Sequence, residues 1–87
     1  MNITSMERHL LEAIKNNEFQ DGSDKSDVVN HEIWYMTYQD VDSRIIGKDQ
    51  IAGVMGSLVK KGLAGVQFEG KDSTCWMTEL GWDVLHG

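Results

Sequence analysis

The chain has 87 residues, of which 40% are hydrophobic and 25% are charged, and this composition is typical of one small globular domain spanning residues 1–87. The sequence has no apolar run long enough to cross a bilayer and no basic-then-apolar leader, so we expect a cytoplasmic protein. Its single cysteine, Cys75, excludes an internal disulfide framework and fits a reducing compartment.

The formal charge of −6 is unevenly distributed along the chain. Residues 1–42 contain three basic and nine acidic side chains, whereas residues 43–87 contain five of each. A nucleic-acid-binding protein normally has a basic face, so this balance argues against DNA binding without excluding it. The acidic front half favours a partner with a basic surface.

The first predicted element is a helix over about Ser5 to Asn17. Thr4-Ser-Met-Glu7 has the spacing of a capping box, which is typical of a helix N-terminus. Apolar residues then recur at helical spacing and form one face: Met6, Leu10, Leu11, Ala13 and Ile14. We expect Phe19 to fold back onto the core, and residues 20–27 to form an exposed acidic loop.

The segment between residues 28 and 46 permits two interpretations. In the first, Ile33–Met36 is a short strand, and Thr37 caps a short helix over Tyr38–Arg44. In the second, one longer helix runs from about Asp27 to Arg44. In the first interpretation we expect Val41 to be a core residue, Ile45 and Ile46 to line the turn, and Gly47 to let the backbone bend.

A second clear helix is predicted over residues 48–61. Its core stripe follows the i, i+3, i+4, i+7 pattern and consists of Ile51, Val54, Met55 and Leu58. Gly62 is expected to end this helix in a left-handed conformation. The opposite face carries Gly53 and Gly56, each costing about 1 kcal/mol relative to alanine. These glycines either let a partner backbone approach or relieve crowding inside the domain.

A β-hairpin is predicted next, because the runs Leu63–Glu69 and Thr74–Thr78 flank a polar, glycine-containing turn. With Lys71 and Asp72 as the loop, Val66 pairs with Met77. Strand alternation then places these residues on an apolar side: Ala64, Val66, Phe68, Cys75 and Met77. Trp76 falls on the polar side, and Trp34 and Trp82 are expected at the core or its edge.

A short last helix is predicted after the hairpin, with Thr78 as its N-cap. Leu80, Val84 and Leu85 are expected to pack inward.

The run Ser57-Leu-Val-Lys-Lys-Gly-Leu63, the hairpin and Met77-Thr-Glu-Leu-Gly81 together resemble the end of a winged helix-turn-helix domain. MarR-type regulators and small bacteriophage winged-helix proteins share this pattern, and the resemblance covers about the last half of the chain. It implies an α+β fold with a three-helix core, a C-terminal β-hairpin wing and a short last helix. It also favours the strand at Ile33–Met36 over the long helix.

No pattern in the sequence predicts catalysis, a cofactor or a metal. His9, His31 and His86 lack ligand spacing with Cys75, and no glycine-rich phosphate loop or nucleophile motif occurs. We therefore expect a non-enzymatic protein.

The resemblance implies a DNA-associated transcriptional regulator that uses the helix 48–61 and the wing 63–78. The expected nucleic-acid contacts are Lys48, Gln50, Ser57, Lys60 and Lys71. The alternative is a protein-binding module, such as a phage-type antirepressor, adaptor or inhibitor. The acidic residues that would bind a basic partner are Glu18, Asp21, Asp24 and Asp27. Trp76 would anchor this contact, and Gly53 and Gly56 would admit the partner.

The long terminal helices through which MarR-type regulators dimerise have no counterpart in this sequence. We therefore expect a monomer or a weak homodimer.

Overall fold

A computed structural model describes residues 2–18, 24–35, 37 and 39–87, without the side chains of Glu18 and Lys71. The expectations for Phe19 and Met36 lie outside these residues. In chain order the described elements are α1 (Ser5–Glu18), α2 (Lys25–Val28), β1 (Ile33–Trp34), the 3₁₀-helix η1 (Lys48–Gln50), α3 (Ile51–Lys60), β2 (Ala64–Gln67), the 3₁₀-helix η2 (Gly70–Asp72), β3 (Thr74–Met77) and α4 (Glu79–His86). The predicted α+β class is confirmed.

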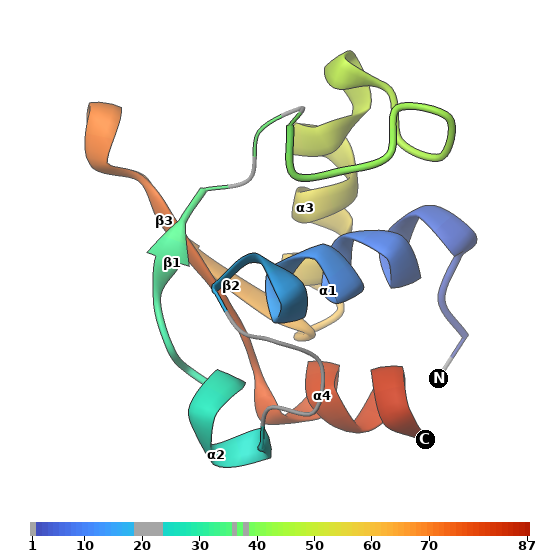
Figure 1. The fold of residues 1–87 in the computed structure, drawn as a ribbon, viewed down its shortest axis with the longest axis vertical. Coiled ribbons are helices and arrows are strands. Elements are labelled where there is room, and N and C mark those ends of the chain that lie inside the picture. The colour runs from blue at the N-terminus through green and yellow to red at the C-terminus, as the bar shows by residue number, and fades with distance from the viewer. Residues whose placement is uncertain (1, 19–23, 36, 38) are drawn as a thin grey trace.

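The three strands form an antiparallel sheet in the order β1-β3-β2. Helix α1 lies across the centre of the molecule and contacts α3, α4 and the sheet (Figure 1). The core lies between these layers and contains the apolar faces of α1 and α3 with Leu63, Cys75 and Met77. Cys75 is fully buried, as expected for a small hydrophobic side chain.

Helix α1 begins as the sequence predicts, through a capping box. The Thr4 backbone N–H donates to Glu7 Oε1 at 2.8 Å, and the Glu7 N–H donates to Thr4 Oγ1 at 3.1 Å. These two bonds satisfy donors that have no partner inside the helix. Four of the five predicted apolar residues are buried, and Met6 packs at the edge of the core.

The predicted helix over residues 48–61 is confirmed, although its first turn is the 3₁₀-helix η1. All four residues of the predicted core stripe are buried. Gly62 has a φ of 78°, so it ends α3 in the left-handed conformation that glycine adopts without strain. Gly47 has a φ of −67°, which any residue can adopt, and the expected need for glycine there is wrong.

The helix expected over Tyr38–Arg44 is not formed by the described residues, and the long-helix alternative is also wrong. Turns occupy residues 39–46 instead. The Asp40 carboxylate accepts the Thr37 N–H at 2.8 Å, and the Asp42 carboxylate accepts the Arg44 N–H at 2.9 Å. The Thr37–Asp40 bond is of the kind that caps a helix, but no helix follows it among residues 39–46. The Asp42–Arg44 bond is a local side-chain bond that competes with helix formation. Val41 is partly buried against the core, Ile46 is fully buried, and Ile45 is exposed.

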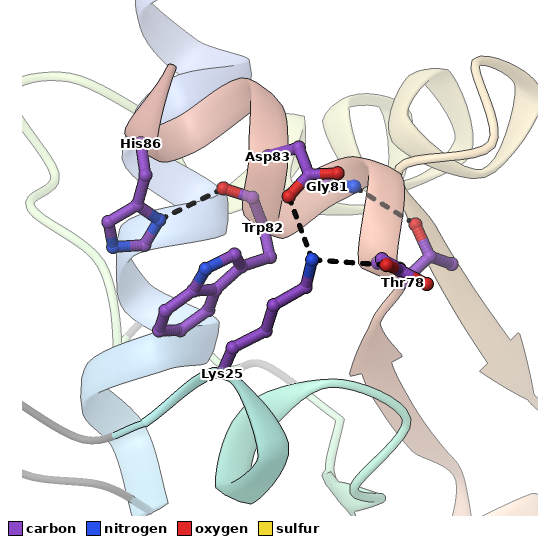
Figure 2. Close-up of polar contacts among 7 residues, drawn as sticks. Lys25, Thr78, Gly81, Trp82, Asp83 and His86 are labelled. Atoms are coloured by element: carbon purple, nitrogen blue, oxygen red, sulfur yellow. Dashed lines mark hydrogen bonds and ion pairs between the residues drawn. The ribbon is translucent and has the colours of Figure 1, made fainter.

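The acidic segment is not a loop throughout, because Lys25–Val28 forms the short helix α2. Lys25 Nζ reaches α4, where it lies 3.1 Å from Glu79 Oε1 and 3.0 Å from Asp83 Oδ1 (Figure 2). Val28 is buried beside this contact. The expected loop is wrong for this segment because Lys25 forms ion pairs with α4 and Val28 is buried, and these two contacts fix the helical turn.

The predicted hairpin is present with a register shifted by two residues. Val66 pairs with Cys75 and Ala64 with Met77, and residues 68–73 make a longer connection than expected. A shift by two keeps every side chain on its predicted face of the sheet. Phe68 lies beyond β2 and is 73% exposed, so its expected burial is wrong.

The last helix is also confirmed, and Thr78 caps it by accepting the Gly81 N–H at 3.1 Å (Figure 2). The hairpin therefore precedes α4, and the wing does not lie at the C-terminus. Val84 and Leu85 pack against the core, whereas Leu80 is exposed, contrary to expectation. Among the described residues, no helix is long and apolar enough to cross a bilayer.

Candidate interaction surface

Helix α3 and η1 present an exposed face to solvent. Because the core stripe turns inward, the outward face carries Asp49, Ala52, Gly53, Gly56, Val59 and Lys60. A Cβ atom added at Gly53 or Gly56 would have no neighbouring atom within 4 Å. The two glycines therefore do not relieve crowding inside the domain, and this alternative is wrong. They leave the helix backbone accessible to a molecule outside.

An apolar groove of about 390 Å³ lies beside this face, between α3 and the part of the sheet near Tyr35, Val66 and Phe68. Its lining consists of Tyr35, Ala52, Met55, Gly56, Val59, Val66 and Phe68. The rings of Tyr35 and Phe68 lie 5.6 Å apart between centroids. Val59 is 42% exposed, so apolar surface continues from the groove onto the helix.

Four of the five expected nucleic-acid contacts lie on η1 and α3, whereas Lys71 lies in η2 of the hairpin connection. Lys48, Gln50 and Lys60 are exposed. Gln50 Oε1 accepts the Gly47 N–H at 2.8 Å, which uses part of its amide inside the chain. The Ser57 hydroxyl donates to Glu7, so Ser57 turns toward α1. The Lys71 side chain lies outside the part of the structure that is described.

Glu7 is a buried carboxylate that joins α1 to the side of α3 facing away from the groove. It is 2% exposed and accepts from Lys61 Nζ at 2.8 Å as well as from Ser57 and Thr4. Burial by itself raises the pKa of the Glu7 carboxyl, but these hydrogen bonds together outweigh it and lower the pKa from 4.5 to about 2. Lys61 is therefore engaged inside the fold.

Trp76 lies on the outer face of the sheet, away from α3. It stands opposite Gly65, where an added Cβ atom would come within 2.2 Å of the indole ring. Trp76 is half-buried, whereas Trp34 on the same outer face is 62% exposed. The expected partner-binding residues are thus not brought together, because Gly53 and Gly56 lie on the helix side of the sheet. The expected burial of Trp34 is wrong.

The acidic front is only partly described. Asp24 and Asp27 are exposed near α2, whereas Asp21 and the side chain of Glu18 lie outside the described residues.

Near the C-terminus, the rings of Trp82 and His86 stack at 4.0 Å, and Lys15 Nζ lies 5.2 Å from the Trp82 ring centroid. Trp82 packs at the core edge as expected.

The sequence did not indicate that Tyr35, Val59 and Phe68 line a groove. One signal was present for Val59, because it lies at the margin of the α3 core stripe and is apolar without belonging to it. Phe68 lies in the connection after β2, which is longer than the sequence pattern indicated. Tyr35 lies in a segment that the sequence allowed to be either a strand or part of a long helix, so the direction of its side chain could not be predicted.

No group of three metal-ligating side chains gathers among the described residues. Comparisons with protein-family models, with curated proteins and with solved structures found no significant match.

Proposed function

We propose that this protein is a non-enzymatic protein-interaction module that binds its partner through the outward face of α3 and the adjoining apolar groove. The observation that supports this proposal is the lining of the groove, which consists entirely of apolar, aromatic and small residues. Apolar grooves beside a helix with accessible backbone suit a protein segment that carries apolar side chains. Gly53 and Gly56 keep the partner-contact role that the sequence suggested for them, whereas Trp76 is not part of the proposed contact.

The charge of the region favours a protein over DNA as the ligand. Phosphate contacts need several cations on one face. Among the cations around α3, Lys61 is paired with Glu7, and Arg44 is paired with Asp42 at 2.9 Å. The apolar side chains of the groove would gain little from a phosphate backbone, whereas their burial against a protein is favourable.

We also propose that the fold is a winged helix whose usual second helix is replaced by the turns at residues 39–46. Apart from the additional short helix α2 between α1 and β1, the order α1, β1, α3, β2, β3, α4 supports this assignment. The module has no proposed catalytic residue or cofactor. Its cytoplasmic location stays a prediction from the single cysteine.

The proposal is tested by affinity capture with the tagged protein from the cells that produce it. Gly56→Lys places a long cation on the backbone that the partner is proposed to approach. We expect it to abolish capture of a partner that the wild type retains. The matched control is Gln67→Lys, which adds the same charge to an exposed position on the outer face of the sheet. The proposal is contradicted if the wild type, Gly56→Lys and Gln67→Lys all capture the partner equally.

A second candidate function is DNA association through the same helix, as the winged-helix resemblance implies. One observation favours it: Lys48 and Lys60 are exposed at the two ends of α3 and η1, on either side of the open glycines. Binding should then weaken steeply with salt, with a slope set by about three to five phosphate contacts. If micromolar protein shifts neither random nor genomic duplex DNA at low salt, this candidate fails.

A further inference from the structure

We propose that the partner of the α3 face is a second copy of this chain, bound with the two α3 helices antiparallel about a two-fold axis. This inference rests on the proposed function and names the partner of the same surface.

The exposed face is self-complementary. Gly53, Gly56 and Lys60 lie within a sector of roughly 60° around α3, at about 100° per residue. Asp49 precedes α3 in the 3₁₀-helix η1, and at about 120° per residue there it lies beside the same sector. Gly53 and Gly56 are equally far from the midpoint between Val54 and Met55, and so are Asp49 and Lys60. A two-fold axis at that midpoint therefore sets Gly53 opposite Gly56 of the second copy. It also sets Asp49 opposite Lys60 of the second copy. Each of these contacts occurs twice, because the interface is isologous.

The charges needed for this pairing are available. Asp49 and Lys60 are both exposed, and among the described residues neither forms an ion pair within its own chain. Antiparallel pairing brings together two Asp49–Lys60 pairs, one at each end of the contact. Parallel pairing would place like charges side by side, so the charges select the antiparallel arrangement.

The centre of the face permits a close approach. Because neither glycine has a neighbour within 4 Å of its Cβ position, the two backbones can meet there without displacing a side chain. Val59, beside this seam, adds apolar surface that the second copy would cover. A single helix pair buries less than the roughly 1,200 Å² of a standard interface, so we expect a weak dimer.

The test is sedimentation equilibrium from about 10 µM to about 1 mM protein. We expect the wild type to dimerise over this range, and Asp49→Lys and Lys60→Asp each to be monomeric, because each puts two like-charged pairs at the seam. Mixing the two variants should restore a heterodimer, since both pairs are again of opposite sign. The double variant Asp49→Lys/Lys60→Asp should dimerise alone. Circular dichroism checks that every variant is folded.

Three results overturn the proposal: a wild type that is monomeric throughout, single variants that dimerise like the wild type, or a mixture that does not associate. Failure here is distinguishable from failure of the proposed function. If the wild type is monomeric while Gly56→Lys still abolishes capture of a different protein, the interaction module stands and only the second copy is excluded.

Discussion

At the scale of single residues, Glu7 decides how α1 is fixed to α3. Its carboxylate accepts from Lys61 at 2.8 Å and from Ser57 and Thr4, while it is almost completely buried. Replacing Glu7 by Gln keeps the shape but removes the charge that satisfies Lys61. We expect Glu7→Gln to lower the free energy of unfolding by about 2–3 kcal/mol, measured by urea denaturation at pH 7.

The same residue predicts a pH dependence. Because the folded pKa of Glu7 is lowered from 4.5 to about 2, its contribution is fully present above about pH 4.5 and is lost as the pH falls toward 2. Wild-type stability should therefore fall across this window by up to about 3 kcal/mol more than that of Glu7→Gln. Asp27→Asn is the control, because the Asp27 carboxylate is exposed and forms no ion pair among the described residues. Parallel curves for wild type and Glu7→Gln would contradict the assignment.

At the scale of elements, the inner face of α3 is buried in the core, whereas Gly53 and Gly56 on its outer face lower the stability of the helix relative to alanine. Ala at positions 53 and 56 would meet no atom within 4 Å, so nothing in the monomer opposes it. Each of Gly53→Ala and Gly56→Ala should stabilise the monomer by about 0.5–1 kcal/mol, measured by thermal unfolding at low protein concentration. Both should weaken capture of the partner, because a methyl group separates the backbones. Stabilisation without weaker binding would place the interface elsewhere.

The hairpin offers a second test, since Gly65 is constrained by Trp76. An added Cβ at position 65 would come within 2.2 Å of the indole, so Gly65→Ala must displace that ring. We expect Gly65→Ala to cost about 1–3 kcal/mol in the wild type and less than about 0.5 kcal/mol in a Trp76→Ala background. A double-mutant cycle of urea denaturation measures this coupling. Independent, additive effects would show that Trp76 does not lie over Gly65.

Elements with a strong apolar period could be predicted from the sequence, and those fixed by single contacts could not. The capping box at Thr4 and Glu7 and the stripe from Ile51 to Leu58 each combine several agreeing signals. Residues 39–46 lack such a period. The His9 ring nitrogen Nε2 accepts the Asp42 N–H at 2.9 Å, a contact across 33 positions that no local pattern indicates.

The candidate surface could be predicted only in part, for a related reason. The pattern identified the outward glycines of α3, because they interrupt a helix that otherwise has a regular core face. It could not show that their Cβ positions are open, since this depends on what the sheet and the turns leave uncovered. It also could not assign Phe68 to the groove, because the length of the hairpin connection sets the register.

At the scale of the whole molecule, self-association through α3 couples stability to protein concentration. A partner that binds the folded chain and not the unfolded chain raises the free energy of unfolding by mass action. Above the dissociation constant of the dimer, each tenfold rise in concentration should raise the Tm by about 3–5 °C for a chain of this size. Scanning calorimetry at several concentrations measures this slope. Asp49→Lys should show a Tm that does not change with concentration, and a similar slope in both proteins would place the association on a surface other than α3.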